Sequence, residues 1–200
     1  MIVVVYRSAI LVISLASPLF CLSADVAAAA PSRQTLEVRS DPQGGIRATG
    51  SMQIAAPQAV VQAILTNYPA WPELFPLEVL RIEQIGDRVL TELQINHGFL
   101  FGTRRLILEN RLLPDGGVVS TLVGGDFRQY VRTWRLGPGQ GNRGTEAELD
   151  LLIEIETWAP DWILVRIVRS ELEGHFELLR QAAQEQAARD RTAENRTLGH

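Results

Sequence analysis

The chain contains one cysteine, three histidines and no large excess of charge of either sign. Because Cys21 lies within the first thirty residues, a chain cleaved after them would carry no disulfide and no thiol chemistry. The formal net charge of -4 gives no basic surface for nucleic acid, and we expect no nucleic-acid partner. A metal site needs at least three protein ligands in a defined geometry, and no cluster supplies them. We therefore predict neither a metal nor a cofactor.

The sequence also lacks the usual catalytic constellations. It contains no strained serine elbow and no serine–histidine–acid set. The glycine-rich residues 137–144 lie between two expected strands and open no helix, so they do not predict a phosphate-binding loop. Acid/base chemistry by His97 or a carboxylate such as Glu92 is open, but no one residue is favoured. These absences favour binding over catalysis.

Long apolar runs are confined to the N-terminus. Residues 1–30 have an early cation at Arg7, an apolar run and then small residues, which is the layout of a secretory signal peptide. We predict cleavage between Ala24 and Ala30, and a periplasmic or secreted mature protein. The alternative is an uncleaved segment that tethers the protein to the membrane, although this run is short for a span and Pro18 interrupts it.

The remaining chain is predicted to form one domain. We assign residues 31–44 to a polar lead-in with turn chemistry, residues 45–188 to the folded domain and residues 189–200 to a polar tail. Hydrophobic residues make up 46% of the sequence, which is enough for a packed core.

Hydrophobic periodicity predicts one helix at the end and a sheet before it. A helix is expected from Pro57, with Asn67 and Pro69 ending it, and residues 70–76 are expected to be a turn or a short second helix. A period of two predicts strands over 46–54, 78–85, 88–97, 103–113, 118–123, 127–136 and 145–156, with a further short strand over 35–40 left open. A long helix is expected from Pro160 to about Ala188. The fold class is thus α+β: a curved antiparallel sheet of about seven strands around a long C-terminal helix, with one or two short helices after the first strand.

Four stretches in this order resemble the START-like superfamily with its helix-grip fold. They are "MQIAAPQAVVQAILTNYPAWPELFP", "GDFRQYVRTWRL", "RGTEAEL" and "WAPDWILVRIVRSELEGHFELLRQAAQ". The resemblance covers about Gly50 to Glu185 and is closest to the coenzyme-Q-binding, polyketide cyclase/dehydrase and lipid transport group. One departure is Asn67, where the family usually has an aspartate. The resemblance implies a cavity between the sheet and the C-terminal helix that holds a hydrophobic ligand.

Candidate ligand-binding residues follow from strand alternation and from this resemblance. If Trp134 points inward, as the family pattern implies, Tyr130 and Arg132 point inward with it, and Arg104 is a second candidate to hold a polar head group. The alternative is that these faces point outward, or that the arginines pair with acidic neighbours at the rim. The full candidate set is Trp71, Leu74, Phe75, Leu93, Ile95, His97, Phe99, Phe101, Arg104, Tyr130, Arg132, Trp134, Val168, Leu172 and Phe176.

Two apolar segments are predicted to lie at the edge of this cavity. The aromatic residues of 64–76 either cap it or plug the edge of the core. The residues around Phe99 and Phe101 cap its entrance, touch a membrane or fold back into the core.

We predict an exported binding or carrier protein for a hydrophobic small molecule: a lipid, an isoprenoid or quinone, or a polyketide-like aromatic. The alternatives are a cyclase or dehydratase that uses acid/base residues in the same cavity, and a protein- or membrane-interaction module.

Overall fold

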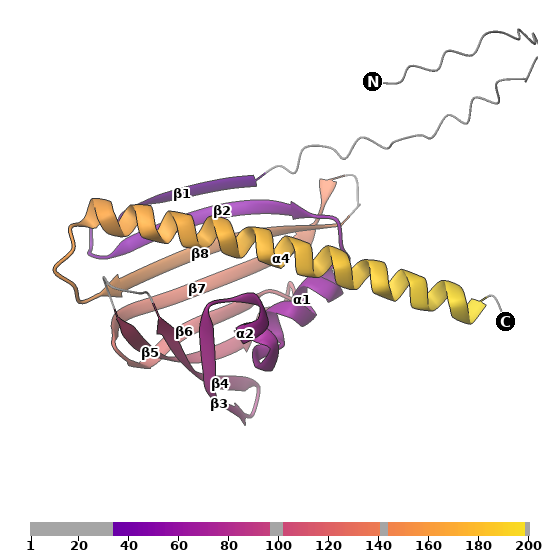
Figure 1. Cartoon of the computed structure of the whole chain (residues 1–200), viewed down its shortest axis with the longest axis horizontal. Helices are drawn as coiled ribbons and strands as arrows, with labels where there is room; N and C mark the ends of the chain where they lie inside the picture. The colour runs from indigo at the N-terminus through magenta and orange to yellow at the C-terminus, as the bar shows by residue number, and fades with distance from the viewer. Residues whose placement is uncertain (1–33, 97–101, 141–143, 199–200) are drawn as a thin grey trace, which may run out of the picture. The chain divides into compact units, whose positions relative to one another are not determined.

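A single antiparallel sheet organises the domain (Figure 1). The computed structural model describes residues 34–96, 102–140 and 144–198. The strands are β1 (Gln34–Ser40), β2 (Ile46–Ile54), β3 (Leu77–Ile85), β4 (Arg88–Asn96), β5 (Thr103–Leu112), β6 (Val118–Gly125), β7 (Phe127–Pro138) and β8 (Thr145–Ile155). They follow the order β1-β2-β8-β7-β6-β5-β4-β3. This confirms the predicted fold class, with an eighth strand added to the seven expected.

The additional strand is β1, at one edge of the sheet. It pairs with β2 over its whole length, yet Val38 is its only buried residue. An edge strand that buries so little shows weak alternation, which is why the sequence left it open.

The N-terminal hairpin joins the rest of the sheet through the pairing of β2 with β8. Ile46 lies opposite Ile153 and Ile54 lies opposite Thr145. The Thr145 hydroxyl is fully buried and donates a hydrogen bond of 2.8 Å to the Ala56 carbonyl, which secures the start of β8 beneath the segment that leaves β2. Strands far apart in the chain are thus adjacent, and the meander from β3 to β8 is completed by the N-terminal hairpin.

Short helices follow β2, as predicted. They are α1 (Gln58–Thr66), the 3₁₀ turn η1 (Tyr68–Ala70) and α2 (Trp71–Leu74). Pro57 precedes α1 and its carbonyl accepts the first helical hydrogen bonds, from Val60 and Val61. α1 ends at Thr66 because Asn67 leaves the helical region and Pro69 cannot continue the ladder.

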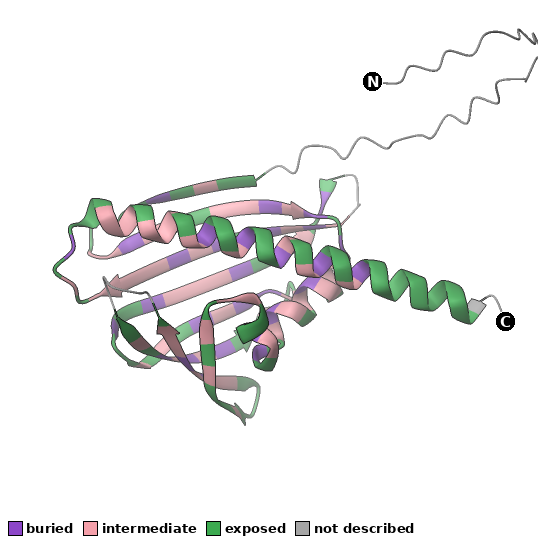
Figure 2. Cartoon of the chain, in the orientation of Figure 1, coloured by how far each residue is buried: buried purple, intermediate pink, exposed green. Residues whose placement is uncertain are grey.

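The C-terminal helix, α4 (Asp161–Leu198), lies across one face of the sheet (Figures 1 and 2). Its buried side chains repeat at helical spacing, from Leu172 through Phe176 and Leu179 to Ala183 and Ala187. The helix runs past its predicted end near Ala188 to Leu198, and residues 188–197 are exposed. This extension has no apolar stripe, but it is rich in helix-forming residues and has local side-chain pairs such as Gln186–Asp190. Within the described residues, no helix combines the length and apolarity needed to cross a bilayer.

A glycine in β2 sets how closely α4 approaches the sheet. A Cβ at Gly50 would lie 2.7 Å from the Thr35 carbonyl oxygen and 3.0 Å from Cζ of Phe176. The Phe176 ring therefore rests on bare backbone on one side, and its centroid lies 5.5 Å from that of Trp134 on the other. This contact anchors the middle of α4.

The acidic side chains of β8, which are Glu146, Glu148, Asp150 and Glu154, lie on its outer face. Asp150 pairs with Arg47 at 3.0 Å, and Glu156 pairs with Arg128 at 2.9 Å. These ion pairs join β8 to β2 and β7 on the outer face, so the apolar residues of β8 face α4.

Candidate ligand-binding cavity

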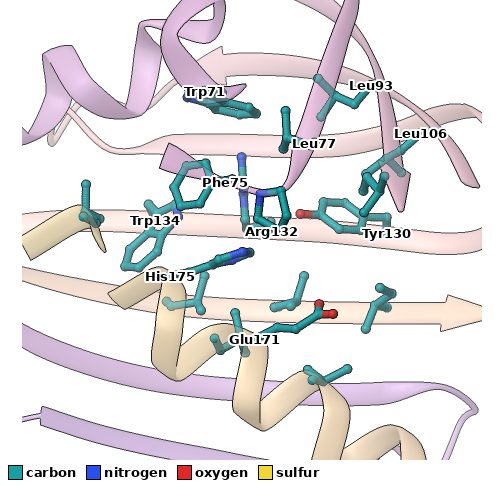
Figure 3. Close-up of a pocket in the computed structure, with 18 of the residues that line it drawn as sticks. Trp71, Phe75, Leu77, Leu93, Leu106, Tyr130, Arg132, Trp134, Glu171 and His175 are labelled. Carbon is teal, nitrogen blue, oxygen red and sulfur yellow. The ribbon is translucent and has the colours of Figure 1, made fainter. Parts of the chain in front are cut away.

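A cavity of about 120 Å³ lies between the sheet, α2 and α4 (Figure 3). Its wall combines apolar side chains from α1, β3, β4, β5, β7, β8 and α4 with a few polar groups. The lining residues are Ile64, Leu65, Trp71, Phe75, Pro76, Leu77, Leu93, Ile95, Leu106, Phe127, Tyr130, Arg132, Trp134, Leu149, Leu151, Ile153, Val168, Glu171, Leu172, His175 and Leu179. An apolar enclosure with few convergent polar groups is the usual form of a small-molecule site.

Aromatic rings close one side of this cavity. Trp71 is buried and packs edge-on against Tyr68, with ring centroids 4.9 Å apart, and against Phe75 at 6.3 Å. Phe75 in turn meets the ring of His175 on α4, with centroids 4.7 Å apart. The segment after α1 is therefore joined to the terminal helix by a ring contact that borders the cavity.

Arg132 is the one charged side chain that the sheet contributes to the wall of this cavity, among the residues described. Its guanidinium carbon lies 5.0 Å from the centroid of the Trp71 ring, in cation–π geometry. One terminal N–H donates to the Ser120 hydroxyl at 3.3 Å, while Nε is buried without a hydrogen-bond partner. In Figure 3 the Tyr130 hydroxyl points toward this guanidinium.

A buried polar network stands behind Arg132. The Ser120 hydroxyl donates to the Asn110 side-chain oxygen at 2.7 Å, and the Asn110 amide donates to the Thr91 hydroxyl and to the Val89 carbonyl, each at 3.0 Å. Register explains the alignment: Asn110 lies opposite Ser120, and Ser120 opposite Arg132. Thr91, Asn110 and Ser120 are almost fully buried, so the network belongs to the interior of the sheet.

Burial and a neighbouring charge shift the pKa of Tyr68 in opposite directions. Burial raises the pKa of its phenol above the usual value, because the phenolate is poorly solvated there. The Arg132 cation acts in the opposite direction, favouring the phenolate, and is the smaller effect. The pKa of Tyr68 is therefore sensitive to the charge of Arg132, which lines the cavity.

A second cavity, of about 200 Å³, lies beneath the first turns of α4. It shares Phe127, Ile153, Val168 and Glu171 with the first cavity. These residues form a partition, and the two spaces are neighbours along the same face of the sheet. Val168 is only partly buried, because the N-terminal half of α4 does not seat fully on the sheet.

The structure brings nine of the candidate residues to the first cavity. They are Trp71, Phe75, Leu93, Ile95, Tyr130, Arg132, Trp134, Val168 and Leu172. The inward orientation of the β7 face follows from the side chain of Trp134, which is buried against α4.

Three candidates lie elsewhere. Phe176 is fully buried behind Trp134 and is part of the core, not of the wall. Leu74 ends α2 and does not reach the cavity. Arg104 sits near the start of β5 opposite Ile95, with its Nε buried, but outside the cavity lining. His97, Phe99 and Phe101 lie outside the described residues.

Several lining residues were not among the candidates. Leu149, Leu151 and Ile153 alternate along β8 and lie on its inward face. Glu171 and His175 lie one helical turn apart, and both line the cavity. Glu171 and His175 follow Val168 by three and seven residues, and this helical spacing is the signal that could have found them. No group of three metal-ligating side chains occurs within the described ranges.

The sheet, the single long helix and the cavity between them define a START-like fold. The structure resembles a START superfamily protein from Mycobacterium smegmatis, with a TM-score of 0.56 and 16% identity, covering 70% of this chain and 97% of that one. A fragment of the STAR-related lipid transfer protein from Xanthomonas axonopodis gives a TM-score of 0.61 at 14% identity, covering 76% of this chain and 93% of that one. The di-domain ARO/CYC StfQ from the steffimycin biosynthetic pathway gives 0.57 at 17% identity, covering 71% of this chain and 52% of that one.

Residues 54–174 match the model of the polyketide cyclase / dehydrase and lipid transport family, and the chain belongs to this family. The match includes α1, η1, α2, the strands from β3 to β8 and the first part of α4. The comparison with curated proteins gives no match. Membership in this family points to hydrophobic-ligand binding, lipid transfer or cyclase roles.

Proposed function

We propose that this protein is an exported carrier that binds a hydrophobic small molecule between the sheet and α4. The ligand is a lipid, an isoprenoid or quinone, or a polyketide-like aromatic. The observation that carries the proposal is the apolar cavity with the Arg132 guanidinium in its wall. Apolar burial drives binding, and the few polar groups orient the ligand.

The cavity volume constrains the ligand. At about 120 Å³ the first cavity is smaller than the ~300–1,000 Å³ of common small-molecule sites, and close to the ~150 Å³ of an engineered cavity that admits benzene. A single ring fits as the structure stands. A longer ligand extends past Phe127 and Val168 into the second cavity, or separates Phe75 from His175.

The direct test is mass spectrometry of organic extracts from the full-length chain expressed with its own N-terminus. Wild type should co-purify with a hydrophobic compound, and Val168→Phe, which narrows both cavities, should lose it. Val123→Phe is the matched control, because Val123 is exposed on β6. An empty wild-type protein that also fails to take up added lipid would contradict the proposal. The mass of the secreted chain tests export, which is expected to remove about the first thirty residues.

A cyclase or dehydratase is the second candidate function. Glu171 and His175 favour it, because a carboxylate and an imidazole one helical turn apart on the same cavity wall can act as acid and base. Incubation of the extracted ligand with wild type would then yield a product that has lost water. Glu171→Gln and His175→Gln would bind the ligand without converting it. Recovery of unchanged ligand from wild type would exclude this role for the extracted compound.

We also propose that the protein contacts membranes through Trp158 and Trp162. Their exposed fractions are 77% and 63%, and they flank Ala159 and Asp161, which line the second cavity. Tryptophan favours the interface between water and lipid. Because Asp161 between the two tryptophans is acidic and exposed, the surface suits zwitterionic lipid better than anionic lipid.

Flotation with phosphatidylcholine vesicles tests this contact. Wild type should bind and the double variant Trp158→Ser, Trp162→Ser should not. The control is Leu112→Ser, which removes an exposed apolar side chain from β5. Equal binding by the double variant and wild type would rule out these tryptophans as the contact.

A further inference from the structure

The guanidinium of Arg132 has more hydrogen-bonding capacity than the protein uses. Within the described part of the chain, its one hydrogen bond goes to the Ser120 hydroxyl, and no carboxylate lies within 4.0 Å of it. Its Nε is buried with no partner. A buried donor without an acceptor is costly, and native structures seldom tolerate one without a reason.

The neighbours of Arg132 hold its guanidinium in place but do not accept hydrogen bonds from all of its N–H groups. Trp71 supports the face of the guanidinium, and the Ser120 oxygen fixes one terminal nitrogen. Ser120 is itself held, because its proton goes to the Asn110 oxygen, which leaves its lone pairs to Arg132. Neither support carries a negative charge. The sheet therefore presents a fixed cation whose counter-charge is not supplied by its neighbours.

We propose that the ligand supplies this counter-charge: the bound molecule carries a carboxylate that accepts hydrogen bonds from the remaining N–H groups of Arg132, with the Tyr130 hydroxyl beside it. This rests on the proposed carrier function and specifies the class of ligand. A guanidinium matches the planar fork of a carboxylate and forms two parallel hydrogen bonds to it. The apolar remainder of the ligand lies against Leu93, Leu106 and Leu151.

Glu171 determines which way round the ligand lies. It lines the same cavity from α4, on the wall that faces the sheet (Figure 3). A carboxylate that approached α4 would meet a like charge, whereas one that approaches β7 meets Arg132. The charged end of the ligand therefore lies at the sheet. The tail lies toward Phe127 and the second cavity, along a path of about 16 Å from Arg132 at the usual rise of a strand.

The test compares ligands that differ only in the head group. Dodecanoate and dodecan-1-ol are titrated into the full chain, with binding followed by calorimetry. Wild type should bind the acid at least about tenfold more tightly than the alcohol, since hydrogen bonds to charged groups are the strong ones. Arg132→Met should remove this preference and keep the affinity for the alcohol. Arg135→Met, on the outer face of the same strand, should change neither affinity.

Two further variants test the geometry. Ser120→Ala should reduce the preference for the acid, and Glu171→Gln should increase it. If wild type binds both ligands equally, the head-group assignment is wrong and the carrier function stands. If wild type binds neither, the head-group assignment is also wrong, and the organic extracts of the purified chain decide the carrier function separately. The comparison in wild type requires no variant, so poor folding of Arg132→Met would leave the test intact.

Discussion

Replacing Phe176 with alanine should cost stability without directly removing a ligand contact. The ring is fully buried between Trp134 and the backbone at Gly50, and sheet backbone cannot move into the space that the ring leaves. Phenylalanine-to-alanine changes in protein cores lower the free energy of unfolding by about 3–5 kcal/mol. Because the surroundings of Phe176 relax little into the space, we expect a loss near the upper end of this range. In a domain of this size the loss lowers the melting temperature by about 2–4 °C per kcal/mol.

Equilibrium unfolding in urea, followed by circular dichroism, measures the change. The matched control is Leu178→Ala on the same helix, where the side chain is 37% exposed and the expected loss is about 1 kcal/mol or less. If Phe176→Ala costs no more than Leu178→Ala and instead abolishes ligand binding, the ring belongs to the cavity wall. The packing argument would then be refuted.

Three other substitutions or titrations test the packing and the electrostatics around the cavity. Gly50→Ala should destabilise the protein by about 1–3 kcal/mol in thermal melts, because its Cβ would lie 2.7 Å from the Thr35 carbonyl oxygen; a neutral result would mean that β1 moves freely. Asn110→Ala should cost about 1–3 kcal/mol in urea unfolding, because its buried partners lose their hydrogen bonds. The raised pKa of Tyr68 stabilises the fold fully below the unfolded value near 10.0, and this contribution is lost as the pH rises through the folded pKa. Arg132→Met should raise the pKa of Tyr68 further, which an ultraviolet titration of tyrosinate detects; a lowered pKa would contradict the assigned role of that cation.

Local patterns in the sequence were sufficient for most of the elements. Alternation placed the strands from β3 to β8 within a few residues, because each has one buried and one solvated face. The sequence did not predict the edge strand β1 firmly, because few of its side chains are buried. The end of α4 was placed too early because its last turns are held by helix propensity and local pairs, without a packed face.

The cavity residues were predictable only in part. Because side chains alternate along a strand, the sequence correctly placed Tyr130 and Arg132 on the same face of β7 as Trp134. The helical stripe of α4 could not separate Phe176, which packs on Gly50, from Leu172, which borders the cavity, since both repeat with the same period. Arg104 lies on the same face of β5 as the cavity residue Leu106, but Arg104 itself does not line the cavity.

The sequence by itself determined the order of the elements, the side of each strand that is buried and the family to which the chain is similar. These properties depend on neighbours a few positions apart, and periodicity records them directly. The tertiary structure alone decided how β2 meets β8, how Asn110 and Ser120 align behind Arg132, and where α4 leaves a space above the sheet. Cross-strand register and helix seating are set by contacts between distant residues, and no local pattern specifies them.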